Sequence, residues 1–166
     1  MTDKGQLVLT PQLQQAIQML GASWRDLYTL IEEKIEANPL VRWQSPEVDP
    51  VADVEIEVHP AGISANVSDC GELYAESGDD EAMYRDAQWF VRSVERRHET
   101  LYCLCDILIA KQESFLRGEK ATPERLSIRS IADDLGFHES TVLRVATGKT
   151  ARVGDREMSL DELLGR

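Results

Sequence analysis

Near the N-terminus, apolar and polar residues recur with the spacing of two amphipathic helices. Thr10-Pro11 has the features of a helix start, because a hydroxyl can accept a backbone N–H and proline suits the first helical position. The first helix should end at Gly21, and a second should follow after two residues and end at Asn38. So small a hairpin needs a further surface to fold firmly. The stripes predicted to face that surface are Leu13, Ala16, Ile17 and Leu20, then Trp24, Leu27, Tyr28, Ile31 and Ile35.

The next forty residues lack a sustained helical period. From Gln44 to Tyr84 there are 11 acidic residues and no Lys or Arg, interspersed with proline and glycine. Low hydrophobicity with a high like charge is typical of flexible chain, so this segment is interpreted as an acidic linker. Residues 54–58 alternate like a strand, but no ladder partner is evident nearby, so this strand is given little weight.

Helical periodicity returns from about Glu81 and continues to Gly118. Residues 128–135 then predict a helix that stops at Gly136, and residues 139–147 predict the next one. Two short helices joined by such a turn form a helix-turn-helix, whose second helix can enter the major groove of DNA. Ser159 could cap a last short helix in the tail.

These patterns predict an all-α chain with an N-terminal helical hairpin, an acidic flexible linker and a helical bundle that ends in a helix-turn-helix. The expected divisions are 1–43 for the hairpin, 44–81 for the linker, 82–150 for the bundle and 151–166 for the tail.

The formal net charge of -12 argues against nucleic acid at first, because phosphate binding requires Lys and Arg. Its distribution changes that conclusion. Residues 1–43 hold 5 acidic and 4 basic residues, and residues 85–166 hold 14 of each, so the excess lies in the linker. The helix-turn-helix region is therefore nearly neutral, and we expect it to bind DNA weakly in isolation.

Several other classes of function find little support in the sequence. There is no glycine-rich phosphate loop, no metal-ligand spacing and no nucleophile elbow, so we expect neither catalysis nor a cofactor. The three cysteines should be reduced thiols, and they could bind a metal only if a partner supplied further ligands. No apolar run is long enough for a membrane span or a signal region, which favours a cytoplasmic protein that does not contact membranes.

Specific strings within these helices resemble the sigma-54 factors of bacterial RNA polymerase. LTPQLQQAIQML at 9–20 and EANPL at 36–40 are similar to the family's N-terminal regulatory region. AQWFVRSVERRHETL at 87–101 and IADDLGFHESTVLRV at 131–145 are similar to the later part of its core-binding region and the following helix-turn-helix. The chain departs from the family in lacking a counterpart of the C-terminal promoter box and in carrying Leu143 where a small polar residue is usual.

The resemblance implies a partial transcription initiation factor whose partners are the RNA polymerase core, promoter DNA and an AAA+ activator. The residues expected to contact DNA are His138, Glu139, Ser140, Thr141, Arg144 and Lys149. Those expected to contact the activator or polymerase are Pro11, Gln12, Leu13, Gln14, Gln15, Ile17, Gln18, Leu20, Asn38, Pro39, Leu40, Arg92, Arg96 and Arg97.

Other interpretations of the same elements remain. The hairpin could simply pack on its own domain or serve for dimerisation, and a helix-turn-helix can also be a protein interface. The alternative functions are therefore a decoy that occupies the activator or polymerase without supporting initiation, and a simple helix-turn-helix DNA-binding regulator.

Overall fold

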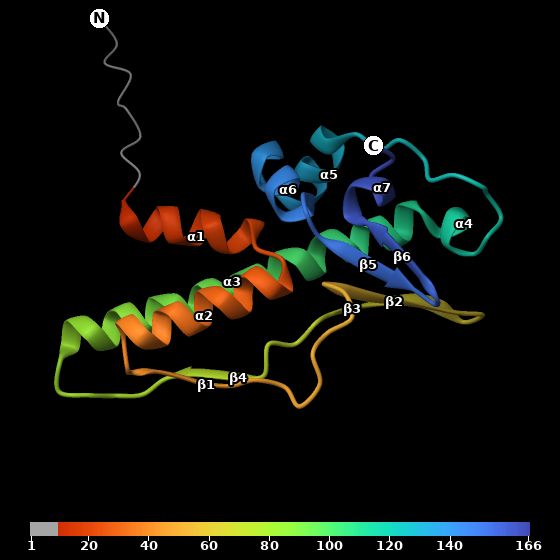
Figure 1. The fold of residues 1–166 in the computed structure, drawn as a ribbon. Coiled ribbons are helices and arrows are strands. Elements are labelled where there is room, and N and C mark those ends of the chain that lie inside the picture. The colour runs from red at the N-terminus through yellow and green to blue at the C-terminus, as the bar shows by residue number, and fades with distance from the viewer. Residues whose placement is uncertain (1–9) are drawn as a thin grey trace, which may run out of the picture.

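The computed structural model describes residues 10–166, which form seven helices and six strands (Figure 1). The helices are α1 (Pro11–Gly21), α2 (Trp24–Ala37), α3 (Glu81–Lys111), α4 (Glu113–Leu116), α5 (Ile128–Leu135), α6 (Glu139–Ala146) and α7 (Leu160–Leu163). The strands are β1 (Val41–Gln44), β2 (Val54–His59), β3 (Gly62–Val67), β4 (Glu72–Ala75), β5 (Thr150–Val153) and β6 (Arg156–Ser159).

The long helix α3 runs the length of the molecule and contributes to two hydrophobic cores (Figure 1). Its N-terminal half packs through Phe90 and Val94 with Met19 of α1, with Leu27 and Ile31 of α2 and with β1. Its C-terminal half packs against β2, β3, β5 and the helices α5, α6 and α7. The N-terminal helices and the helix-turn-helix are thus held side by side on one scaffold.

The helix boundaries expected from the sequence are confirmed, and the side chains that cap them explain why. Thr10, Ser23, Asp80 and Ser127 each accept a hydrogen bond from a backbone N–H in the first turn of α1, α2, α3 and α5, respectively. Ser159 does the same for α7. Because such caps act locally, their residue types indicate the starts of these five helices, whereas α4 and α6 have no side-chain cap.

The expectation of an all-α chain with a flexible linker is wrong. The acidic segment supplies β2, β3 and β4, and β1 directly precedes it: β1 pairs with β4, while β2 forms a hairpin with β3. β2 also pairs in parallel with β5, nearly a hundred residues later, and β5 pairs with β6. Glu55 and Glu57 are the exposed positions of β2 and alternate with the buried Val54 and Ile56. These charges therefore form the solvent face of a half-buried sheet.

The apolar stripe expected on α1 is only partly correct. Leu13 is 42% exposed, whereas Met19, which the stripe omitted, is 1% exposed and joins the core with α2 and α3. Burial along α1 thus increases from its exposed first turn toward Met19, which packs against α2 and α3. A period of 3.6 residues gives the direction of a stripe but not how far along the helix a neighbour covers it.

Candidate functional site

The helices α5 and α6 form the predicted helix-turn-helix. Gly136 ends α5 in the left-handed region at φ 70°, and its N–H bonds back to carbonyls of the last turn. The inward faces of the two helices contribute Ile131, Val142 and Val145 to the core, each at most 1% exposed. Burial of this face leaves the opposite face of α6 in solvent, as DNA recognition by such a helix requires.

Most residues expected to contact DNA lie on that outer face. His138, Glu139, Ser140 and Arg144 are exposed, and Thr141 is half-buried. Lys149 is different: it is 0% exposed, and its Nζ donates a hydrogen bond to the Leu20 carbonyl oxygen at 2.6 Å. In this structure Lys149 therefore cannot reach a phosphate. The contacts proposed for the exposed residues stay predictions.

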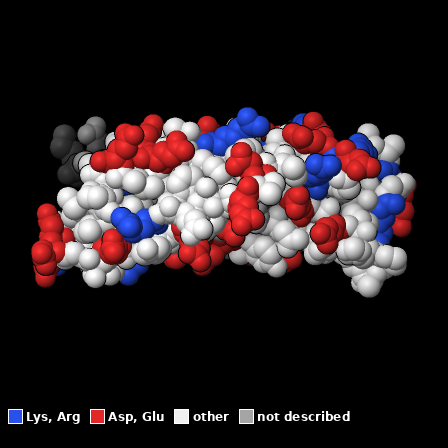
Figure 2. Space-filling model, turned by 60° about the horizontal axis from the view of Figure 1, so that its bottom comes forward, with Lys and Arg blue, Asp and Glu red and all other residues white. Residues whose placement is uncertain are grey.

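Acidic side chains are spread over the face of the molecule shown in Figure 2, with Lys and Arg scattered among them. Around the helix-turn-helix, Asp133, Asp134 and Glu139 are exposed, and Lys111 pairs with Asp134 at 3.5 Å. These carboxylates would oppose the approach of a polyanion to the helix-turn-helix. Arg129 of α5 and Arg144 of α6 are also exposed, so the helix-turn-helix carries charges of both signs.

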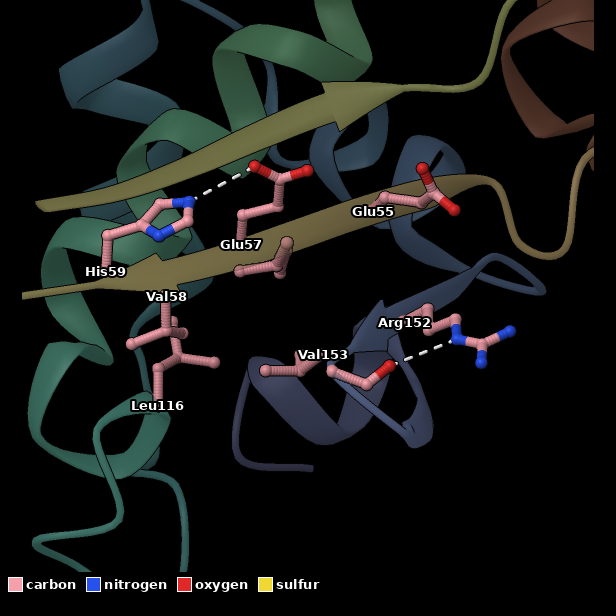
Figure 3. Close-up of a pocket in the computed structure, with 9 residues that line it drawn as sticks. Glu55, Glu57, Val58, His59, Leu116, Arg152 and Val153 are labelled. Carbon is pink, nitrogen blue, oxygen red and sulfur yellow. Dashed lines mark hydrogen bonds and ion pairs between the residues drawn. The ribbon is translucent and has the colours of Figure 1, made fainter.

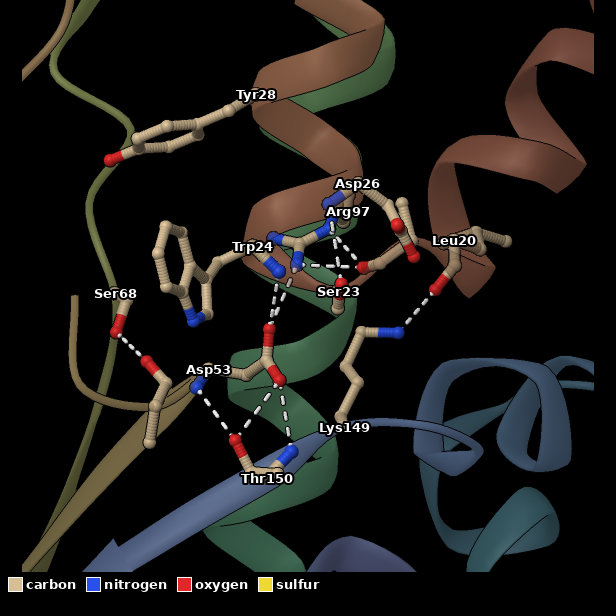
Figure 4. A network of polar contacts seen from close by, with 12 residues as sticks. Leu20, Ser23, Trp24, Asp26, Tyr28, Asp53, Ser68, Arg97, Lys149 and Thr150 are labelled. Atoms are coloured by element: carbon tan, nitrogen blue, oxygen red, sulfur yellow. Dashed lines mark hydrogen bonds and ion pairs between the residues drawn. The ribbon is translucent and has the colours of Figure 1, made fainter. Parts of the chain in front are cut away.

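The turn between α1 and α2 is fastened to the helix-turn-helix unit by two buried cations (Figure 4). Arg97 of α3 donates from Nε and Nη2 to the Ala22 carbonyl oxygen, at 3.1 and 2.9 Å. Lys149, which follows α6, donates to the Leu20 carbonyl oxygen. Both acceptors lie at the C-terminal end of α1, where carbonyls lack helical partners and the helix dipole favours positive charge. The end of α1 is thus bonded both to α3 and to the segment that follows α6.

Asp53, at the entrance to β2, supplies the negative charge of this network and is 2% exposed (Figure 4). Its Oδ1 accepts from the Trp24 backbone N–H at 2.6 Å and lies 3.6 Å from Nη2 of Arg97. Its Oδ2 accepts from the Thr150 backbone N–H at 2.9 Å. One carboxylate therefore links the start of α2, the middle of α3 and the start of β5.

The electrostatics of the network follow from burial of two cations with one anion. Burial, with a smaller contribution from the nearby Arg97, lowers the pKa of Lys149 to about 8, while Asp53 opposes both effects. Burial also lowers the pKa of Arg97, again opposed by Asp53. Burial also lowers the pKa of His98, the residue after Arg97 on α3, to about 4, with a contribution from Arg97. The carboxylate of Asp53 therefore offsets part of the free-energy cost of burying Arg97 and Lys149 close together.

The residues expected to contact the activator or polymerase fall into two groups. Asn38 and Arg97 are buried and have structural partners: Asn38 Nδ2 donates to the Met83 carbonyl oxygen at 2.9 Å and to Asp86 at 2.8 Å. Leu20 and Leu40 are half-buried. The exposed members are Pro11, Gln12, Leu13, Gln14, Gln18, Pro39, Arg92 and Arg96, and Gln15 and Ile17 are half-buried. Their assignment to partners stays a prediction.

A hollow of about 460 Å³ lies where β5 turns away from β2 at Gly154 (Figure 3). Val58, Leu116 and Val153 line it, and at its rim His59 Nε2 lies 3.3 Å from Glu57 Oε2. Within residues 10–166, no group of three or more His, Cys, Asp or Glu side chains is placed to hold a metal ion. No helix in the same range is long and apolar enough to cross a membrane.

Comparison with protein-family models identifies two parts of the chain, the N-terminal helices and the segment that contains the helix-turn-helix. Residues 4–42 match the family model described as "Sigma-54 factor, Activator interacting domain (AID)". Residues 79–165, just over half of the 166 residues, match the model described as "Sigma-54, DNA binding domain". The chain belongs to the sigma-54 factor family. Sigma-54 factors are not enzymes, as expected for this chain from its sequence.

Individual sigma-54 relatives agree with this assignment. An RNA polymerase sigma-54 factor of Xanthomonas euvesicatoria is 32% identical over 101 residues, which are 61% of this chain and 20% of that protein. The factor of Bacillus subtilis is 35% identical over 69 residues, or 42% of this chain and 16% of the relative. A crystal structure of Aquifex aeolicus sigmaN bound to promoter DNA aligns with 84% of this chain and 49% of that one, at 20% identity and a TM-score of 0.44. The matched part is thus a fifth or less of the length of these curated relatives.

The sequence interpretation missed the central residue of the site. Asp53 lies between the two matched regions, among the acidic residues assigned to a linker. Its signal in the sequence is the alternation of apolar and acidic residues that begins directly after it. The finer assignment of residues 82–150 to the later part of a core-binding region stays a prediction, as do the proposed domain divisions.

Proposed function

We propose that this chain acts in transcription initiation as a sigma-54-like factor that links the RNA polymerase core, promoter DNA and an AAA+ activator. In this proposal α1 is the element that the activator contacts, and α6 faces the promoter. The observation that supports this proposal is the hydrogen bond from Lys149, shortly after α6, to the Leu20 carbonyl oxygen at the end of α1. A force or a contact applied to α1 would therefore act on the DNA-facing helix through a direct connection.

The packing of α1 supports its role as the handle for an activator. Among Pro11–Gly21, only Met19 is buried. A hollow of about 400 Å³ separates it from α2 beside Gln18 and Leu30, and a second one of about 190 Å³ lies between it and α3. A helix that is held at one end and loosely packed along its length costs little to displace. Such an element can take two bound positions of similar energy, which a remodelling ATPase requires.

A test of the promoter-facing role uses Arg144, which is exposed on α6. Arg144→Ala should weaken binding to a promoter duplex by about 1–3 kcal/mol if the guanidinium contacts a base, and should reduce discrimination against a scrambled duplex. Arg42→Ala is the matched control, because Arg42 is exposed on β1 and has only a distant ion pair with Glu76 at 3.6 Å. Equal affinity of both variants and the wild type at low salt would refute a DNA-reading α6.

A test of the activator role uses capture by an AAA+ activator loaded with a nucleotide transition-state analogue. Gln14 and Gln18 are exposed on α1, so Gln14→Ala/Gln18→Ala should weaken capture while circular dichroism stays unchanged, since the two residue types differ by only tenths of a kcal/mol in helix propensity. Gln44→Ala/Asn66→Ala removes two exposed amides from the strands and should leave capture unchanged. Equal capture by all three chains would contradict the assignment of α1.

A second candidate function is favoured by the acidic residues beside the recognition helix. Asp133, Asp134 and Glu139 would oppose a phosphate backbone, but they suit a helix-turn-helix that binds a basic protein surface. The chain would then occupy polymerase or activator without contacting promoter DNA. This candidate predicts that Glu139→Gln weakens protein capture, whereas the promoter-facing role predicts that the same change strengthens DNA binding.

A further inference from the structure

The four-stranded sheet has a notch beside β2 that no strand of residues 10–166 fills. β3 pairs with β2 along its whole length, from Val54 to His59, whereas β5 pairs with the other side of β2 only as far as Ile56 and then turns away at Gly154. A hollow of about 460 Å³ occupies this place (Figure 3). β2 lies between the two regions that match the sigma-54 family models, so neither match accounts for the notch.

The free edge of β2 presents backbone hydrogen-bonding groups to the notch. In an antiparallel pair, successive residues turn their N–H and C=O groups to opposite sides of the strand. The carbonyl oxygen of Asp53, directly before β2, accepts from the Ser68 N–H on the β3 side at 2.9 Å. Alternation from there directs the groups of Val54, Ile56 and Val58 to the β5 side, where only Val54 and Ile56 meet β5. The N–H and C=O of Val58 are therefore placed to pair with an added strand, as sheet edges do when they bind extended peptides.

The side chains around the notch indicate the chemistry of such a strand. Val58, Leu116 and Val153 line the inner part of the hollow (Figure 3). On the solvent side Glu57 is exposed, and within residues 10–166 its one ion-pair partner is His59, at 3.3 Å. Neighbouring strands place side chains of the same face opposite each other. A segment in the notch should therefore carry an apolar side chain beside Val58 and a positive one beside Glu57.

β5 shows the same complementarity where it does pair with β2. Arg152 lies opposite Glu55, and the residues on either side of Arg152 are apolar and lie opposite the apolar neighbours of Glu55. Glu57 and Val58 repeat this order of acidic and apolar residues two positions further along β2. A basic residue followed by an apolar one would thus continue the pattern of β5 across the notch.

We propose that the notch binds an extended segment of a partner protein, which adds a short strand to β2 and places a Lys or Arg beside Glu57 and an apolar residue beside Val58. The free part of β2, from Glu57 to His59, is about 10 Å long, so about three residues of the segment pair with it. Arg117, which donates to the His59 carbonyl oxygen at 3.0 Å, lies at that end of β2. The site uses neither α1 nor α6, so it does not depend on the contacts proposed for those helices.

The test measures binding of two labelled hexapeptides to the full chain by fluorescence anisotropy. In one peptide lysine and valine alternate, and in the other glutamate and valine alternate. The wild type should prefer the lysine–valine peptide. Glu57→Lys should weaken that peptide by about fivefold and strengthen the glutamate–valine peptide, because opposite charges across a strand pair attract and like charges repel. Glu72→Lys reverses an exposed carboxylate on β4, outside the notch, and should have neither effect.

A second measurement distinguishes strand addition from general attraction between a basic peptide and an acidic protein. Bound lysine–valine peptide should slow hydrogen exchange of the Val58 amide, because that N–H gains an acceptor. The same peptide with a methylated backbone should leave the exchange unchanged, because its N-methyl groups block the approach of a strand. Circular dichroism checks that the variants keep the fold, and Glu57→Gln, which removes the charge alone, should show a smaller loss in the same direction.

Three results would overturn the proposal. Equal loss of lysine–valine affinity in Glu57→Lys and Glu72→Lys would show attraction to the acidic surface as a whole. Unchanged exchange of the Val58 amide in the peptide complex would exclude a strand beside β2. Dimerisation of the wild type in sedimentation, abolished by Glu57→Lys, would assign the notch to a second copy of the chain and not to a partner protein.

Discussion

Removal of the Asp53 carboxylate should separate the N-terminal helices from the helix-turn-helix unit before it affects any other part of the fold. In Asp53→Ala the buried Arg97 loses its anion, and the backbone N–H groups of Trp24 and Thr150 lose their acceptors. Removing one partner of a buried ion pair costs about 3–5 kcal/mol. That is a large fraction of the roughly 5–15 kcal/mol that stabilises a domain of this kind.

The measurement is urea unfolding of matched variants combined with amide hydrogen exchange. Asp53→Asn keeps the shape and one acceptor, so its loss should be smaller than that of Asp53→Ala. Asp49→Ala removes an exposed carboxylate four residues earlier and should change the free energy of unfolding by less than about 0.5 kcal/mol. In the Asp53→Ala variant, amides of α1 and of the first turn of α2 should exchange faster than those of β2.

A double-mutant cycle isolates the ionic contribution. Arg97→Met removes the guanidinium and retains much of its volume, and Asp53→Ala in that background should cost about 2 kcal/mol less than in the wild type. Loss of under about 1 kcal/mol in the single Asp53→Ala variant, or strict additivity of the two changes, would show that the network is not the link inferred here.

Three further predictions concern other parts of the molecule. The folded pKa of Lys149 lies below its unfolded value, so the free energy of unfolding should rise as pH increases from about 8 to 10, and Lys149→Met should abolish that rise in urea titrations. The pKa of His98 is likewise lowered to about 4, so stability should fall as pH drops below about 6.5, by about 2 kcal/mol at pH 5, and His98→Leu should remove this part of the acid sensitivity. Amides of β2 that pair with β3 and β5 should be protected from hydrogen exchange; rapid exchange throughout residues 54–59 would restore the flexible-linker interpretation.

The sequence alone determined the features of this protein that depend on neighbouring residues. Thr10, Ser23 and Ser159 mark helix starts because a cap bonds to a backbone group only a few residues away. Gly136 marks the turn of the helix-turn-helix because its conformation there is left-handed. The family strings lie on these same helices, which is why the resemblance to sigma-54 factors could be found before the structure.

Only the tertiary structure determined that the acidic segment forms strands and that Arg97 and Lys149 are buried. β2 is stable because β5 pairs with it from nearly a hundred residues away, a partner that no local pattern contains. Arg97 and Lys149 have the sequence context of exposed helix and loop cations, yet they are buried because carbonyls of the α1–α2 turn and the carboxylate of Asp53 converge on them. An ion is buried only where its counter-charge and hydrogen-bond acceptors come together around it. Because long-range packing brings these groups together, the sequence around a charged residue does not show whether that residue is buried.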